Sequence, residues 1–185
     1  MNEKIMHALR AQAAVFLAGL TLLLSCGIAH GGSAREDNQA LLLPPSQEDQ
    51  AVLKRRLQTA KRDIEAFRIF AENFRSNGDA KSLAQLQYPV DDFLKKHVDN
   101  LLSQSLQHAT LETTRLTAEI MFIKARLFLN LSRGDAARKV VAEMKNRFGS
   151  YQKISVELPG KTTTLDEGIR LFDEELAKAD LAGKR

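Results

Sequence analysis

The sequence has no tryptophan, one cysteine, two tyrosines, four prolines and ten glycines among its 185 residues. A single cysteine excludes an internal disulfide, an all-cysteine zinc site and a protein-ligated iron–sulfur cluster. So few glycines and prolines argue against a fold of many strands and tight turns. The shortage of tryptophan and tyrosine argues against an aromatic sugar-binding platform. Hydrophobic residues make up 44% and charged residues 27%, a globular composition with room for one domain and a tail.

The short motifs that mark common catalytic sites are also missing. The chain has no His-Glu-x-x-His, no Gly-x-Ser-x-Gly and no glycine-rich phosphate loop. His97 and His108 would lie about 16 Å apart on one helix, too far to share a metal ion. Neighbouring acids such as Glu174 and Glu175 are typical of a solvent-exposed helix face. We therefore expect no metal and no cofactor, and we favour a non-catalytic protein over a hydrolase with an unrecognised site.

Residues 1–25 have the pattern of a secretory signal peptide. Lys4 and Arg10 form a basic start, and an uncharged, mostly apolar run follows from Ala11 to Ser25. That run is shorter than the about 20 residues of a membrane span. We expect the segment to export the rest of the chain.

The apolar run ends in Leu23-Leu24-Ser25-Cys26-Gly27. This segment resembles the lipobox of bacterial lipoproteins, with leucine three positions before the cysteine and a small residue just before it. The resemblance implies that the Cys26 thiol receives a diacylglyceryl group and that the signal peptide is cut before Cys26. Two or three acyl chains would hold a soluble domain at a bilayer, whereas one anchors only marginally.

Three alternatives to lipidation remain open. Cys26 could belong to a leader that is cut later, after Gly31 or Ala34, which would leave a soluble periplasmic protein. Residues 11–29 could stay as an uncleaved anchor, or the start codon could be misassigned. The lipid-anchored form would sit in the bacterial cell envelope, at the outer membrane or at the periplasmic face of the inner membrane.

Residues 26–45 are predicted to form a flexible tether between the anchor and a helical domain over 46–182. The tether contains Gly31-Gly32-Ser33 and ends in Pro44-Pro45, a composition that resists regular structure. The part from Gly27 to Pro45, about 19 residues, would span roughly 25 Å as a random coil.

The spacing of apolar residues predicts a mainly α domain, a bundle of five or six helices. The strongest stripe runs from about Ser46 to Ser76 and should bury Ile64, Phe67 and Phe74. Pro89 should break or kink the next helix, so that a third begins at Asp91. The expected helices cover 46–76, 79–88, 91–108, 111–131 (capped by Thr110), 134–148 and 165–182. Inward positions of the 111–131 helix are Ala118, Met121, Phe122, Ala125, Phe128 and Leu129.

Residues 118–148 also resemble a tetratricopeptide-type helix pair. Ala125-Arg126-Leu127-Phe128-Leu129 precede a Gly134-Asp135-Ala136-Ala137 turn, and Val140-Val141 follow. The resemblance implies a tetratricopeptide-like helical array as the alternative to a non-repeating bundle. It covers one unit, and a stable stack needs about three.

A small β-hairpin is predicted near 153–164. Ile154, Val156 and Leu158 alternate with polar residues, Pro159-Gly160 favours a turn, and Thr162 and Thr164 belong to a β-branched return strand. An irregular loop is the alternative. We nominate these five strand residues as a partner surface for strand addition; the competing interpretation is a cover over the last helices.

The 46–76 helix is basic, with seven basic and three acidic side chains between Val52 and Ser76, a net charge of +4. Arg55, Arg56 and Arg62 could contact anionic lipid or cell-wall polymer, or simply face solvent. No aromatic residues interleave with them, so nucleic-acid binding is not indicated. We expect an exported accessory or scaffold protein that binds another envelope protein. A periplasmic ligand-binding module and a hydrolase are the alternatives.

Overall fold

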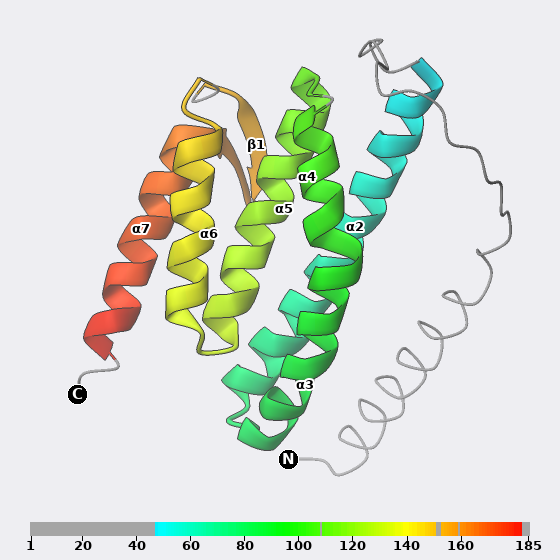
Figure 1. Ribbon diagram of the computed structural model, residues 1–185. Coiled ribbons are helices and arrows are strands. Elements are labelled where there is room, and N and C mark those ends of the chain that lie inside the picture. Colours follow the sequence, from blue (N-terminus) through cyan, green and yellow to red (C-terminus); the bar gives the residue numbers. More distant parts are fainter. Residues whose placement is uncertain (1–46, 108, 151–152, 159, 183–185) are drawn as a thin grey trace, which may run out of the picture. The chain divides into compact units, whose positions relative to one another are not determined.

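The computed structural model describes residues 47–107, 109–150, 153–158 and 160–182. The predicted signal peptide, Cys26, the tether and His108 lie outside the described residues. The helices are α2 (Gln47–Ser76), α3 (Ala80–Phe93), the π-helical η1 (Leu94–Val98), α4 (Asp99–Gln107), α5 (Leu111–Asn130), α6 (Gly134–Arg147) and α7 (Leu165–Ala182). The strands are β1 (Ser155–Leu158) and β2 (Lys161–Thr164). The predicted mainly α bundle with one small hairpin is confirmed (Figure 1).

Helix α2 spans the predicted range, but its buried seam differs from the predicted one. Ile64 is fully buried, whereas Phe67 and Phe74 are only half-buried, so the expectation for these two rings was wrong. A strict seven-residue repeat drifts by about 20° per repeat around a straight helix. The line of buried residues along α2 therefore continues from Ile64 to Arg68 and not to Phe67. Phe67 lies beside this line, with its ring centroid 5.2 Å from that of Phe93.

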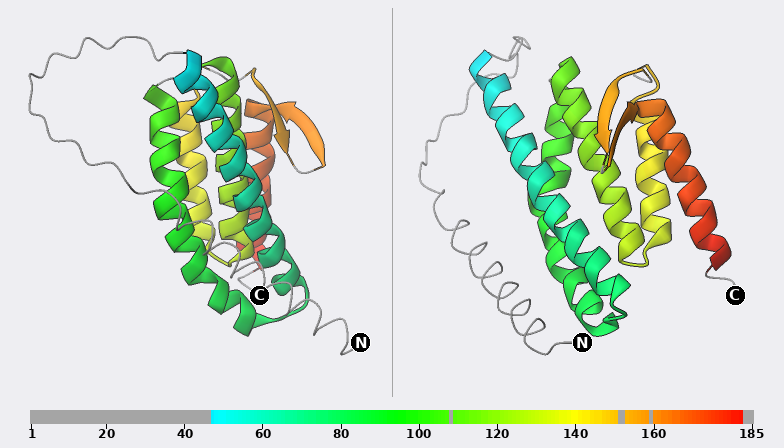
Figure 2. Two further views of the ribbon diagram at one scale, coloured as in Figure 1. Left: turned by 90° about the vertical axis from the view of Figure 1, so that its right-hand side faces the viewer. Right: turned by 180° about the vertical axis from the view of Figure 1, so that it is seen from behind.

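Pro89 does not end a helix, contrary to prediction. Helix α3 continues through it, and α3, η1 and α4 form one continuous rod (Figures 1 and 2). A proline removes one backbone donor from a helix. Buried Val90 and Phe93, on the next turn, fix this stretch against the core. In η1 the N–H of Asp99 donates to the carbonyl of Leu94, which gives the wider π turn. The separate helix expected to begin at Asp91 is therefore part of this rod.

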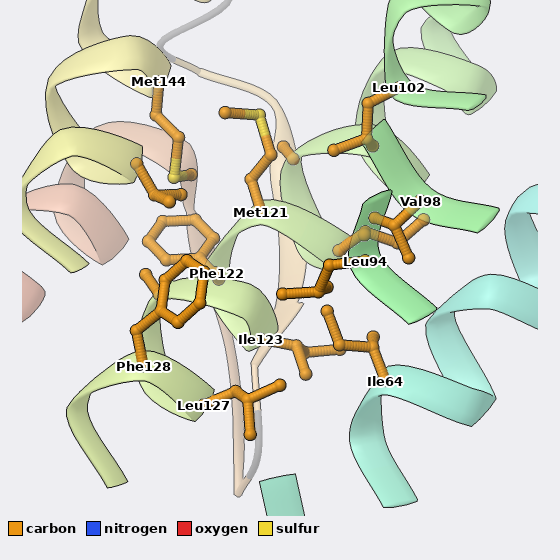
Figure 3. Close-up of a cluster of buried hydrophobic side chains, with 14 of the residues drawn as sticks. Ile64, Leu94, Val98, Leu102, Met121, Phe122, Ile123, Leu127, Phe128 and Met144 are labelled. Atoms are coloured by element: carbon orange, nitrogen blue, oxygen red, sulfur yellow. The ribbon is translucent and has the colours of Figure 1, made fainter. Parts of the chain in front are cut away.

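Helix α5 is the centre of the bundle. Thr110 caps it as predicted: its hydroxyl accepts from the N–H of Thr113, and the Thr113 hydroxyl accepts from the N–H of Thr110. Fourteen of its 20 residues are buried, including all six predicted inward positions. Figure 3 shows side chains from α2, η1, α4 and α6 meeting those of α5 in one apolar cluster.

Helices α5 and α6 lie side by side and are joined by Leu131-Ser132-Arg133 (Figures 1 and 2). Ser132 has a positive φ of 60°, which lets the chain reverse direction. This is the helix pair expected over residues 118–148. A tetratricopeptide-like array remains a prediction.

Strands β1 and β2 form the predicted antiparallel hairpin, with Val156 opposite Thr163 and Leu158 opposite Lys161. Gly160 has a φ of 87°, which suits the third position of a type II turn. The N–H of Leu165 donates to the carbonyl of Ile154 at 2.8 Å and closes the open end of the hairpin. Strand β1 packs on α5, and β2 leads directly into α7.

Candidate functional site

The side chain that fixes the hairpin is Glu119, a carboxylate in the middle of α5 with no solvent exposure. Its Oε2 accepts from Lys61 Nζ of α2 at 2.8 Å, and its Oε1 accepts from the N–H of Glu157 of β1 at 2.8 Å. A buried charge is tolerated when it is paired and hydrogen-bonded in this way. Both oxygens are engaged by the fold, so Glu119 joins three elements instead of presenting an acid to a substrate.

A second buried polar group links α4 to α5. The hydroxyls of Ser105 and Thr117 lie 2.7 Å apart, and each also contacts a main-chain carbonyl of its own helix. These contacts satisfy the hydroxyls inside the core. Their arrangement is that of a structural cross-link between helices.

The predicted partner residues of the hairpin divide into two groups. Val156 is fully buried, and Ile154 and Leu158 are half-buried against the core. Their apolar side chains therefore pack on the protein itself, and strand addition at the main chain of the hairpin stays a prediction. Thr162 and Thr164 are exposed. The Thr164 hydroxyl accepts from the N–H of Glu167 at 3.4 Å, at the start of α7.

Hydrogen-bond alternation shows which main-chain groups of the hairpin face outward. The bond from Leu165 to Ile154 marks a hydrogen-bonded pair, so Val156 with Thr163 and Leu158 with Lys161 are also such pairs. The residues between them, Ser155 and Glu157 on β1 and Thr162 on β2, direct their N–H and C=O away from the partner strand. The Glu119 carboxylate accepts a hydrogen bond from the N–H of Glu157 at the outer edge of β1. At the outer edge of β2, no described residue hydrogen-bonds the main chain of Thr162.

Two surface grooves flank the hairpin. The Arg115 groove, of about 810 Å³, lies between the start of α5 and the start of β1. It is lined by Leu111, Glu112, Arg115, Gly149, Ser150, Lys153, Ile154 and Ser155. The α7 groove, of about 440 Å³, lies between the hairpin turn and α7, where Arg126 pairs with Glu175 at 2.5 Å. Sequence reasoning missed both grooves, because each combines residues far apart in the chain.

The predicted basic residues Arg55, Arg56 and Arg62 are exposed on α2, and none of them lines either groove. Arg56 lies 3.5 Å from the Gln104 amide oxygen, and Arg62 lies 3.2 Å from the Asp63 carboxylate. These three arginines are exposed on α2 and line no described pocket.

Arg68, on the buried seam of the same helix, has a different role. Its hydrogen bonds to Glu65 raise the pKa of its guanidinium above the ordinary value, and Glu72 adds to the effect. The guanidinium is held within its own helix by these two acids, so Arg68 is not an exposed cation like Arg55, Arg56 and Arg62.

No group of three or more His, Cys, Asp or Glu side chains within the described ranges could hold a metal ion. None of the helices in this part of the chain is long and apolar enough to cross a membrane. Comparison with protein-family models, curated proteins and solved structures finds no match for this chain. The fold defines a helical bundle with a docked β-hairpin, and the two grooves and the β2 edge are its candidate sites.

Proposed function

We propose that this chain is an exported, lipid-anchored envelope protein that acts as a non-catalytic accessory by binding another envelope protein. The anchor is supported by the lipobox-like Leu23-Leu24-Ser25-Cys26 after a signal-like segment. Partner binding is supported by one observation above all: Thr162 is exposed at the outer edge of β2, and no described residue hydrogen-bonds its outward main-chain groups.

The two edges of the hairpin differ in a way that selects β2 as the docking edge. On β1, the Glu119 carboxylate already occupies the N–H of Glu157. On β2, threonines suit strand pairing, and an incoming strand could exchange hydrogen bonds with Thr162. Burial of Val156 holds the hairpin on the bundle, so little ordering of the hairpin would oppose binding.

In the anchored protein, Arg55, Arg56 and Arg62 would strengthen attraction to anionic lipid or cell-wall polymer. Each basic side chain near an anionic membrane surface contributes about 1 kcal/mol to the attraction. Their solvent exposure on one helix supports this role.

The anchor is tested by replacing Cys26 with Ala. We expect Cys26→Ala to remain unprocessed or to leave the membrane fraction, because the thiol that carries the lipid is gone. Mass spectrometry of the native protein should find an acylated Cys26 at the N-terminus. An unmodified N-terminus at Gly32 or Arg35 would exclude lipidation.

The docking edge is tested with Thr162→Pro. Proline removes the outward N–H without breaking a bond inside the hairpin, since Thr162 is not in a hydrogen-bonded pair. Thr162→Val is the matched control, because it keeps the N–H and a β-branched shape. In affinity purification from the protein's own envelope, Thr162→Pro should lose the partner that both native protein and Thr162→Val retain.

The melting temperature of each variant separates lost binding from lost folding. Thr162→Pro and Thr162→Val should melt within a few degrees of the native protein. If folded Thr162→Pro captures the same partners in the same amounts, the β2 edge is not the binding surface.

A further inference from the structure

The Arg115 groove contains two basic side chains whose charge the fold does not fully neutralise. Lys153 is exposed and has no ion pair with any described residue. The nearest carboxylate to Arg115 Nε is that of Glu119, at 3.9 Å, which already accepts from Lys61 and from the N–H of Glu157. Arg115 Nε is buried, and none of the described groups accepts a hydrogen bond from it.

The acidic side chain in the same groove does not compensate for them. Glu112 forms an ion pair with Lys54 of α2 at 2.7 Å, so Lys54, and not Arg115 or Lys153, neutralises its charge. Beside it, Leu111 is 70% exposed and gives the mouth of the groove an apolar surface. Surplus positive charge next to an apolar surface favours an anion that carries an apolar group.

The main chain of β1 adds a third feature to the groove. Ser155 lines it and directs its N–H and C=O away from β2, and neither group has a hydrogen-bond partner in the described part of the chain. A peptide backbone can pair with these groups, whereas a fatty acid or an inorganic anion has no backbone to offer. The groove volume of about 810 Å³ is within the usual range for small-ligand sites.

We propose that the Arg115 groove binds the free C-terminal carboxylate of a peptide whose last side chain is apolar. Arg115 and Lys153 bind the carboxylate. The Arg115 guanidinium can donate two parallel hydrogen bonds to its two oxygens, and Lys153 adds a second positive charge. Leu111 and Ile154 contact the apolar side chain, and Ser155 pairs with the peptide backbone. This site lies on the β1 side of the hairpin and does not depend on the β2 edge proposed above.

The test uses the full chain, labelled with ¹⁵N, and N-acetyl-Gly-Leu with a free carboxylate as the probe. Titration should move the Nε–H resonance of Arg115 and the amide resonance of Ser155 in a saturable way. N-acetyl-Gly-leucinamide, which lacks the carboxylate, should move neither. Arg115→Gln should weaken binding by about ten-fold or more, because the charge-assisted hydrogen bonds are lost.

Further variants make the outcome specific to this groove. Lys153→Gln should weaken binding less than Arg115→Gln, while Arg62→Gln, an exposed arginine outside the groove, should leave it unchanged. Thr162→Pro should also leave it unchanged, which separates this site from the β2 edge. Far-UV circular dichroism melts show that each variant is folded.

The proposal is overturned if the amide probe binds as well as the carboxylate, or if folded Arg115→Gln binds as well as the native chain. Saturable shifts confined to the α7 groove would also overturn it. Octanoate tests for a fatty-acid site: saturable binding of octanoate without binding of the peptide would replace the peptide ligand by a lipid one.

Discussion

At the scale of single residues, Glu119 is the buried carboxylate that joins α5 to α2 and β1. It stands alone among apolar neighbours in the segment Ala118-Glu119-Ile120-Met121-Phe122, and all five residues are buried. Lys61 and the N–H of Glu157 approach it from two other elements, α2 and β1. Its loss would leave the half-buried Lys61 with only the Glu157 carboxylate at 3.5 Å, and the part-buried N–H of Glu157 without its acceptor. An unsatisfied donor of this kind costs more than the hydrogen bond itself.

Glu119→Gln should lower the free energy of unfolding by about 1–3 kcal/mol. The amide oxygen can still accept from Glu157, but the amide cannot pair with the Lys61 charge. Glu157→Gln is the matched control: its carboxylate is 64% exposed and lies 3.5 Å from the same lysine. That change should cost less than about 1 kcal/mol. Urea unfolding followed by circular dichroism measures both, and equal losses would show that Glu119 is no more important than a surface partner.

Burial in α2 was predicted correctly where an apolar side chain also lies on the buried side according to the 3.6-residue helical turn. It was predicted wrongly where these two criteria disagree. Ile64 lies on the buried side of α2 whether the seven-residue repeat or the 3.6-residue turn is followed, and it is fully buried. Phe67 was expected inside because it is aromatic and fits a seven-residue repeat, yet the 3.6-residue turn brings Arg68 to the seam instead. Burial of Glu119 could not be predicted, since its two partners come from residues 58 positions before it and 38 after it. One local signal existed, an isolated acid in an apolar run.

At the scale of elements, both ends of α2, α5, α6 and α7 were predicted to within one residue, and capping signals mark some of these ends. Thr110 starts α5, and Asn77-Gly78, with a φ of 67° at Gly78, follows the end of α2. The α3–η1–α4 rod was wrongly divided at Pro89, because the continuing helix depends on burial of Val90 and Phe93, a tertiary effect. The hairpin was predicted from its alternation, but alternation alone does not reveal which face α5 covers.

Pro89→Ala should stabilise the rod. A proline inside a helix costs about 3 kcal/mol, while the proline also restricts the unfolded chain by up to about 1 kcal/mol. The net gain in the free energy of unfolding should be about 2 kcal/mol, measured by thermal or urea unfolding. Gln87→Ala, an exposed change in the same helix, should alter stability by less than about 0.5 kcal/mol. A loss of stability in Pro89→Ala would mean that the proline ring makes packing contacts worth more than the restored donor.

At the scale of the whole described bundle, one hydrophobic cluster joins every helix and β1. The cluster includes Ile64 of α2, Val98 of η1, Val156 of β1 and Phe172 of α7. Domains with a single core usually unfold in one cooperative step. The hairpin should therefore behave as part of the bundle and not as an independent attachment.

Replacing residues 153–163 with a short Gly-Ser loop should lower the melting temperature of the entire bundle by roughly 10 °C or more. The replacement removes Val156 from the core and the Glu157 N–H from Glu119. Calorimetry of the native protein should show one transition whose calorimetric and van't Hoff enthalpies agree. An unchanged melting temperature would show that the hairpin is only loosely attached, and two transitions in the native protein would show separate cooperative units.

The central position of α5 has a consequence for how the chain is made. Its covering elements come from both sides in sequence, with α2 and α4 before it and α6, β1 and α7 after it. While the chain emerges from a ribosome or a translocation channel, the side of α5 that contacts α6 stays uncovered until α6 itself has appeared. Nascent chains truncated after α5 should therefore attract chaperones or aggregate, because a broad apolar surface on the middle helix awaits residues not yet synthesised.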